Sequence, residues 1–107
     1  MSYKILLASK FVKELKRLNK KYPSLKKEMA KLAEELYKNH FMGAALGNNC
    51  YKIRISIASK GGGKSGGARV ITHLKVSKET VYLLSIYDKA EQANISDKEI
   101  KDRISSL

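Results

Sequence analysis

The sequence predicts an α+β domain: two N-terminal helices packed on a small, antiparallel-rich twisted sheet (βααβββ), followed by a short C-terminal helix. Two amphipathic helical patterns follow each other between residues 9 and 38, and three strand patterns follow each other between residues 51 and 87 without crossover helices. A helix-capping motif then opens the last segment of the chain. Because 107 residues suffice for one hydrophobic core, we expect a single domain over residues 1–107.

The N-terminal part of the chain combines a short strand with a helical hairpin. Residues 3–7 are an apolar run that fits a strand, and Ser9 is a candidate N-cap for a helix reaching about Tyr22. Pro23 and Ser24 end this helix and begin a second one. The apolar stripes consist of Phe11, Val12, Leu15 and Leu18 in the first helix, and of Leu25, Met29, Leu32, Ala33 and Leu36 in the second. We expect the hairpin to pack on the sheet, since neither helix can bury its stripe alone.

The sheet is predicted from residue 51 onward. Residues 39–49 are expected to form a loop whose Phe41, Met42 and Leu46 pack against the core. Residues 51–58 alternate strictly, with Tyr51 and three isoleucines on one face and Lys52 and Arg54 on the other. Residues 69–76 form a return strand, and residues 81–87 are apolar on both faces, which favours a central strand. The capping box at residues 96–99 predicts the final helix.

A glycine-rich basic loop separates the first two of these strands. Five of the seven residues after Lys60 are glycines, and residues 39–78 contain seven cations and no Asp or Glu. The whole chain carries a formal charge of +12, which attracts nucleic acid, anionic membrane or an acidic protein. No apolar run approaches the roughly 20 residues of a membrane span, so we expect no membrane partner. The single cysteine fits a reducing, cytoplasmic location.

Several chemistries fit the sequence poorly. A phosphate-binding loop ending in Gly63-Lys64-Ser65 requires a glycine where Ala58 stands, and it must lead into a helix. The tract without acidic residues supplies no carboxylate for a metal, so we expect neither a metal nor another cofactor. A triad of Ser65, His73 and Asp88 remains an alternative whose geometry the sequence does not fix.

Clustered cations on adjacent strands can bind RNA passively, or they can cleave it. The 2′-hydroxyl beside a scissile phosphate is a nucleophile already in place. Arginine stabilises the charge that develops on phosphorus, and a lysine crowded by other cations can transfer protons. Composition alone leaves both possibilities open.

Three segments resemble the RelE superfamily of bacterial toxins, with the greatest likeness to its HigB-type branch. They are Lys52-Ile53-Arg54, residues 63–71 and residues 83–91, and Lys-Ser-Gly-Gly-Ala-Arg-Val-Ile at residues 64–71 is the most specific part. The resemblance covers about residues 1–104. It implies the toxin of a type II toxin–antitoxin pair, a ribosome-dependent, metal-independent mRNA endonuclease that a protein antitoxin silences, typically a helix-turn-helix DNA-binding protein.

The resemblance also implies site residues. Arg54 and Arg69 match basic active-site positions of the family, Lys89 falls where relatives carry Arg or Lys, and Tyr87 matches an aromatic of the HigB-like segment. We expect Arg54, Arg69 and Lys89 to be catalytic and to converge on one surface, with Arg69 as an exposed strand-edge residue. We further expect RNA or phosphate contacts from Lys52, Lys60, Lys64, Ser65 and Tyr87, and ribosome contacts from Lys13, Lys16, Lys20 and Lys27.

Two other readings stay open at this point. One is a gyrase-poisoning toxin on the same scaffold, as in the ParE branch, against which the cationic cluster argues because that activity needs no cleavage site. The other is a generic nucleic-acid-binding domain. Some relatives stack a C-terminal tyrosine on a base, whereas this chain has no aromatic residue after Tyr87. The general base is therefore left unassigned.

Overall fold

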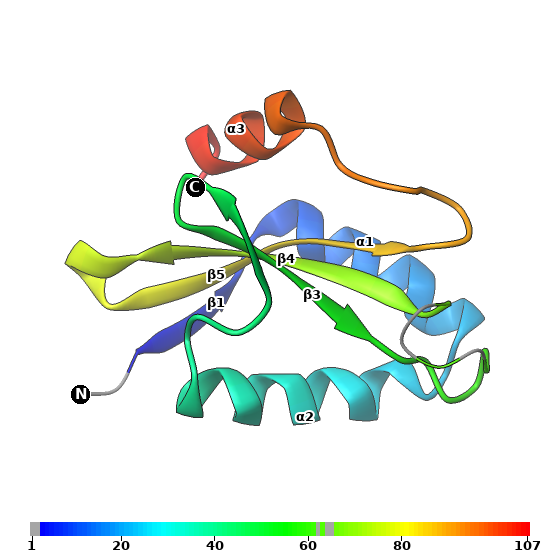
Figure 1. The fold of residues 1–107 in the computed structure, drawn as a ribbon. Helices are drawn as coiled ribbons and strands as arrows, with labels where there is room; N and C mark the ends of the chain where they lie inside the picture. The colour runs from blue at the N-terminus through cyan, green and yellow to red at the C-terminus, as the bar shows by residue number, and fades with distance from the viewer. Residues whose placement is uncertain (1–2, 62, 64–65) are drawn as a thin grey trace.

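The computed structural model describes residues 3–61, 63 and 66–107, and it has three helices and a five-stranded sheet (Figure 1). The elements are β1 (Lys4–Leu7), α1 (Ser9–Lys21), α2 (Leu25–Lys38), β2 (Ala44–Gly47), β3 (Cys50–Ile55), β4 (Ala68–Lys75), β5 (Thr80–Asp88) and α3 (Asp97–Ser105). A 3₁₀ turn, Val76–Lys78, connects β4 to β5. The predicted α+β class is confirmed, and β2 is an additional strand.

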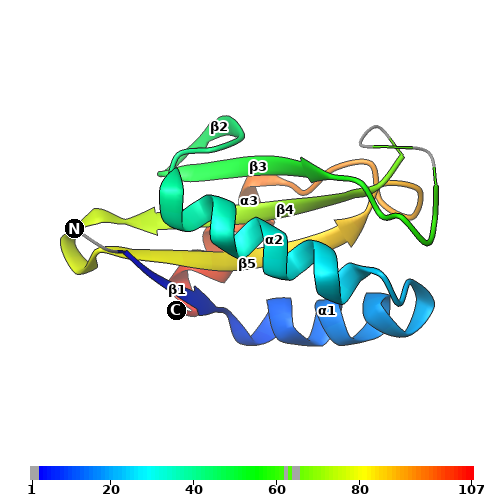
Figure 2. The ribbon, with the colours of Figure 1, turned by 90° about the horizontal axis from the view of Figure 1, so that it is seen from below.

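The strand order places β4 and β5 inside the sheet. The order is β1-β5-β4-β3-β2, with β1 parallel to β5 and the other neighbouring pairs antiparallel. The strand with two apolar faces, β5, has a neighbour on each side, as predicted. β1 pairs only with residues 80–83 of β5, and α1 then runs along the rest of that strand (Figure 2).

The helices cover opposite faces of the sheet. The hairpin of α1 and α2 packs on one face through Phe11, Leu18, Leu25 and Leu36, all fully buried against strand residues such as Val70. α3 lies on the other face (Figure 1), where Ile100 packs with Ile71, Leu84 and Tyr87. The predicted packing of the hairpin is confirmed. Val12 is an exception: it is 39% exposed, because it lies one helical position away from the stripe of Phe11, Leu15 and Leu18.

The prediction of a loop at residues 39–49 is wrong in two respects. Residues 44–47 form β2, which pairs with β3 through a two-residue turn whose Asn48 and Asn49 have φ of 54° and 57°. Phe41 does not pack in the core, because its side chain is 56% exposed. Met42 and Leu46 do pack against the two buried clusters, as expected.

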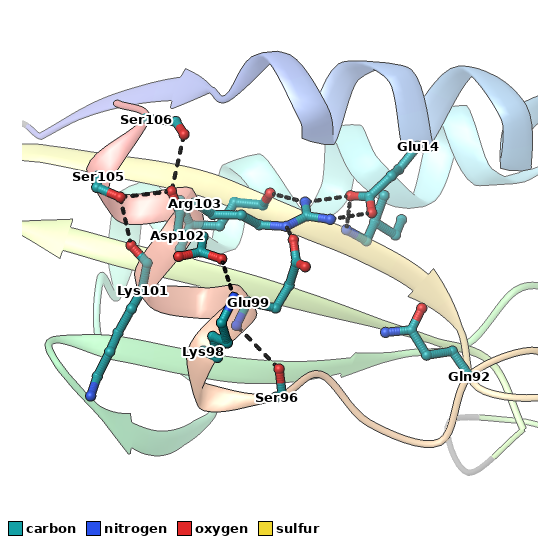
Figure 3. Close-up of polar contacts among 12 residues, drawn as sticks. Glu14, Gln92, Ser96, Lys98, Glu99, Lys101, Asp102, Arg103, Ser105 and Ser106 are labelled. Atoms are coloured by element: carbon teal, nitrogen blue, oxygen red, sulfur yellow. Dashed lines mark hydrogen bonds and ion pairs between the residues drawn. The ribbon is translucent and has the colours of Figure 1, made fainter.

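Polar contacts fix α3 to the sheet and to α1 (Figure 3). The Ser96 hydroxyl accepts a hydrogen bond from the Glu99 amide at 3.1 Å, which confirms the predicted cap. Arg103 donates to both carboxylate oxygens of Glu14 at 2.9 and 2.7 Å, and to the Leu84 carbonyl at 2.8 Å. Among the described helices, none is long and apolar enough to cross a membrane.

Candidate active site

Three of the expected site residues form one row across the sheet. Arg54 of β3 pairs in register with Arg69 of β4, and Arg69 pairs with Tyr87 of β5. Residues paired across adjacent strands project from the same face of a sheet. This is the face that α3 covers, since Tyr87 packs in the same cluster as Ile100.

Arg54 is the exposed member of this row. β2 pairs with β3 only as far as Lys52, so Arg54 lies where the edge of β3 is uncovered by β2. It lines a hollow of about 370 Å³ together with Met42, Gly43, Ala44, Lys52 and Ile53. A second hollow of about 250 Å³ is also lined by Arg54, together with α2 residues that include Glu28, Lys31 and Glu35. An anion can therefore reach the Arg54 guanidinium from solvent.

Arg69 is buried, which corrects the expectation of an exposed strand-edge arginine. Only 4% of the residue is exposed, because β4 is an interior strand with β3 and β5 on its two sides. One of its guanidinium nitrogens, Nη1, donates to the Ala68 carbonyl at 3.1 Å. Arg69 thus adds positive charge directly beside Arg54 while lying mostly below the surface.

Tyr87 is also buried, so the expected RNA contact through its ring is not available in this conformation. The residue is 3% exposed and packs in one cluster with Ile95. Its hydroxyl has no hydrogen-bond partner among the described residues. Burial raises the pKa of this phenol, against an opposing effect of the Arg69 charge. Tyr87 therefore remains protonated at neutral pH beside Arg69.

Lys89 lies at the same end of the sheet as the two arginines. Its backbone amide donates to the Gly67 carbonyl at 3.0 Å, and its Nζ donates to the Ala93 carbonyl at 3.4 Å. Gly67 ends the glycine-rich loop against β3, where a Cβ atom would lie 2.0 Å from the Ile55 carbonyl oxygen. Only glycine fits there, so this position fixes the start of β4 beside the end of β3.

Lys60, expected to contact RNA phosphate, forms an ion pair with Asp88. The Asp88 carboxylate is 1% exposed and also accepts hydrogen bonds from the Tyr22 hydroxyl at 2.8 Å and the Ala90 amide at 3.0 Å. Burial raises the pKa of Asp88, but the bonds from Lys60, Ala90 and Tyr22 outweigh it and the net direction is down. The sequence analysis missed this network, although an acid that directly follows an apolar strand was a signal for it.

The alternative triad is not assembled in the described part of the chain. His73 pairs with Tyr82 near the far end of β4, whereas Asp88 pairs with Ala68 at its beginning. The His73 ring instead lies 3.5 Å from the Cys50 sulfur, and burial raises the pKa of that thiol to about 11. Lys64 and Ser65 lie outside the described residues. Within residues 3–61, 63 and 66–107, no group of three His, Cys, Asp or Glu side chains could hold a metal ion.

The lysines expected to contact the ribosome are exposed. Lys13, Lys16 and Lys20 recur at helical spacing along one face of α1, and Lys27 lies in the first turn of α2. Neighbouring cations on α1 have another role, since Arg17 and Lys21 pair with Glu91 at 3.0 and 3.4 Å. The α1 lysine stripe is thus distinct from the cations that bind the segment after β5.

Comparisons with known proteins agree with this arrangement. Residues 4–105 match the family model of the RelE toxin of the RelE/RelB toxin–antitoxin system. The free double arginine-to-alanine mutant of the E. coli toxin RelE is 17% identical, with a TM-score of 0.66 over 100% of this chain and 99% of that one. The same mutant in complex with a RelBc antitoxin peptide is 17% identical, with a TM-score of 0.62 over 97% and 95% of the two chains. Isolated E. coli RelE is 20% identical, with a TM-score of 0.52 over 98% and 99%.

At these identities the solved structures show a shared fold, and the family model carries the assignment. Its match extends over nearly the whole chain, including all the strands that position Arg54, Arg69 and Tyr87. The chain therefore belongs to the RelE family of toxins of toxin–antitoxin systems.

Proposed function

We propose that this toxin is a metal-independent endoribonuclease that cleaves mRNA on the ribosome and thereby inhibits translation. The observation that carries the proposal is the pairing of Arg54 with Arg69 on one face of the sheet. Two like charges placed side by side repel each other. An anionic ligand bound between or above them would reduce this repulsion. A phosphodiester is such a ligand.

The proposed reaction uses the RNA's own 2′-hydroxyl. Its oxygen attacks the adjacent phosphorus, the bond from phosphorus to the 5′-oxygen breaks, and the products are a 2′,3′-cyclic phosphate and a 5′-hydroxyl. A proton leaves the attacking oxygen and a proton reaches the departing one. Arg54 would donate hydrogen bonds to the non-bridging oxygens, where negative charge grows in the transition state.

The other cations would support Arg54. Arg69 would contribute positive charge to the site from a buried position. Solvent screens the charge of a buried group less than that of an exposed one. Lys89 would be the third catalytic cation. Lys52 would bind a flanking phosphate, and Lys64 and Ser65 of the glycine-rich loop remain proposed RNA contacts. Tyr87 would act as a positioning residue that packs beside Arg69.

We further propose that a protein antitoxin silences this toxin. The E. coli RelE mutant has been solved with a RelBc antitoxin peptide, which supports a partner of the same kind here. An antitoxin with an acidic or amphipathic segment would complement the charge of +12, and it is expected to be a helix-turn-helix DNA-binding protein.

The test compares Arg54→Ala with Arg54→Lys in single-turnover cleavage of mRNA on programmed ribosomes. We expect Arg54→Ala to slow cleavage by about 100-fold to 1,000-fold, by analogy with the loss of one oxyanion-hole donor, and Arg54→Lys to retain part of the rate. The cleaved ends should be a 2′,3′-cyclic or 3′-phosphate and a 5′-hydroxyl, and chelation of transition metals should leave the rate unchanged.

Two outcomes would contradict the proposal. A 3′-hydroxyl product would exclude attack by the 2′-hydroxyl. Growth inhibition that persists in the Arg54→Ala protein, together with stalled gyrase and intact mRNA, would instead support the gyrase-poisoning activity.

A further inference from the structure

Both ends of the glycine-rich loop are attached to two consecutive residues at the end of β5. Lys60, directly before the loop, forms an ion pair with the Asp88 carboxylate. Gly67, the last glycine of the loop, accepts a hydrogen bond at its carbonyl from the Lys89 amide at 3.0 Å. The end of β3, the start of β4 and the end of β5 meet at one end of the sheet (Figure 2). The two attachments therefore fix the loop relative to β5.

The Asp88 carboxylate joins three segments of the chain. It is 1% exposed, and besides Lys60 it accepts hydrogen bonds from the Tyr22 hydroxyl at 2.8 Å and from the Ala90 amide at 3.0 Å. Tyr22 ends α1, and Ala90 lies in the turn that carries Lys89. The Lys60 side chain is itself only 18% exposed. Charge-assisted hydrogen bonds between groups that are this well shielded from water are strong.

The residues that lead into the loop have further contacts, with the helical hairpin. The hydroxyl oxygens of Ser24 and Ser59 are 2.8 Å apart, and the Ala58 amide donates to the Glu28 carboxylate at 2.6 Å. These groups are exposed, so water competes for their hydrogen bonds. They hold residues 58 and 59 against the hairpin, whereas the buried pair of Lys60 and Asp88 holds the loop against β5.

Asp88 borders the arginine row without facing the RNA site. It pairs with Ala68, which directly precedes Arg69 on β4. Successive residues of a strand project to opposite faces of the sheet, and the Asp88 side chain meets Tyr22 on the face that the helical hairpin covers. Asp88 therefore does not contact a phosphate bound at Arg54. Its effect on a reaction there passes through the segments that it holds.

We propose that Asp88 is a positioning residue of the ribonuclease, acting through Lys60 on the glycine-rich loop and through the following turn on Lys89. The loop supplies proposed RNA contacts and Lys89 is a proposed catalytic cation, so both need fixed places relative to Arg54. A displacement of about 1 Å in a positioned group can slow a reaction about 100-fold. The inference rests on the proposed function for the reaction, but the attachment of the loop is independent of it. Lys60 is thereby an anchor of the loop and not an RNA ligand.

The test is a double-mutant cycle of Asp88→Asn and Lys60→Met, read as single-turnover cleavage of mRNA on ribosomes at saturating toxin. We expect each change to slow cleavage about 10-fold to 100-fold while affinity for ribosomes stays the same. The double variant should be no slower than the slower single variant, because either change breaks the same attachment. Lys60→Arg keeps the ion pair and should restore most of the rate. The double variant also leaves no unpaired buried charge, so it serves where a single variant does not fold.

Two controls separate positioning from general stability. Tyr22→Phe removes another hydrogen bond from the same carboxylate but leaves Lys60 in place, so its cleavage rate should stay near that of the original chain. Hydrogen exchange read by NMR reports on the attachment without RNA. The Lys89 amide should exchange about tenfold faster in the double variant, while the Ile100 amide, which donates to the Ser96 carbonyl in α3, should be unchanged.

Several outcomes would overturn the inference. Unchanged cleavage in the double variant, even with faster exchange at Lys89, would leave Asp88 a purely structural residue. Slow cleavage by Lys60→Met alone, with a normal rate in Asp88→Asn, would show that Lys60 binds RNA directly. A Tyr22→Phe protein as slow as the double variant would assign the effect to stability. An original chain that cleaves no mRNA on ribosomes would refute the ribonuclease function instead, and exchange at Lys89 would still decide whether Asp88 holds the loop.

Discussion

Arg54 and Arg69 carry the same charge on the same face of the sheet, yet they differ in exposure. Their replacement should therefore affect the stability of the fold differently. Arg54 lies at an open strand edge, whereas Arg69 is 4% exposed on an interior strand. A buried guanidinium is costly unless its N–H groups find acceptors, and one of these is the Ala68 carbonyl at 3.1 Å. Arg69 thus contributes to folding as well as to the charge of the site.

We predict that Arg69→Ala lowers the free energy of unfolding by about 1–3 kcal/mol, while Arg54→Ala changes it by no more than about 0.5 kcal/mol. The reason is that only Arg69 is buried, so its truncation leaves a gap inside the sheet and removes the hydrogen bond to the Ala68 carbonyl. Urea denaturation followed by circular dichroism measures both values. Arg69→Lys serves as the control that keeps the charge and the aliphatic stem. Equal unfolding free energies for the two alanine variants would show that the Arg69 stem and its hydrogen bond do not support the fold.

The sequence predicted which cations meet but not how deeply they lie. Strict alternation in residues 51–58 put Arg54 opposite the buried isoleucines, and a return strand beginning at Arg69 brought the two arginines together. Burial of Arg69 and the pairing of Lys60 with Asp88 depend on strand order, which places β4 and β5 inside the sheet. Strand order follows from the packing of the whole chain, so a local pattern does not reveal it.

The polar contacts that join α3 to the sheet and to α1 come from one side chain, Arg103. β1 covers β5 only as far as Leu83, and beyond it the Leu84 carbonyl accepts from Arg103 at 2.8 Å while the Ile86 amide donates to Glu14 at 3.2 Å. Arg103 and Glu14 also pair with each other (Figure 3). Together they provide hydrogen-bond partners for backbone groups of β5 where no strand covers its edge. They also join α1 to α3.

We predict that Arg103→Gln loosens α3 without unfolding the domain. Charge-assisted hydrogen bonds to partly buried groups contribute about 1.5–3 kcal/mol, so amide protons of α3 should exchange about 10-fold to 100-fold faster. Hydrogen exchange read by NMR measures this residue by residue. Lys98→Gln is the control, because its ion pair with Asp102 is solvent-exposed and contributes little. Unchanged exchange in α3 of the Arg103→Gln protein would mean that apolar packing of Ile100 alone holds the helix.

The strand that sequence analysis missed, β2, has little strand character of its own. Its residues are Ala-Ala-Leu-Gly, types that are mostly depleted in strands. The usable signal was the turn: Asn48 and Asn49 both adopt positive φ, as the two central residues of a tight hairpin turn require. β2 forms because β3 offers it a partner, so its existence depends on tertiary structure rather than on local propensity.

The fold distributes the charge of +12 over surfaces that differ in whether their cations are paired with acidic side chains. Cations near the segment after β5 are paired, as Arg17 and Lys21 are with Glu91. The α1 lysine stripe, by contrast, is exposed on the outer surface of the helical hairpin. A broad basic surface of this kind attracts polyanions, while the edge of β3 beyond β2 leaves Arg54 exposed to an anionic ligand.

We predict that replacing Lys13, Lys16, Lys20 and Lys27 together with glutamine weakens association with ribosomes and leaves the single-turnover cleavage rate at saturation unchanged. Each phosphate contact that is lost should make the plot of log affinity against log salt shallower by about 0.7–0.9, so the slope should fall by up to about 3. Sedimentation of the protein with ribosomes at several salt concentrations measures the slope. A variant with Lys75, Lys78, Lys98 and Lys101 changed to glutamine carries the same total charge, because it also loses four of the 22 cations. If both variants shift the slope equally, net charge alone drives association; a larger shift in the helical-hairpin variant assigns ribosome docking to that surface.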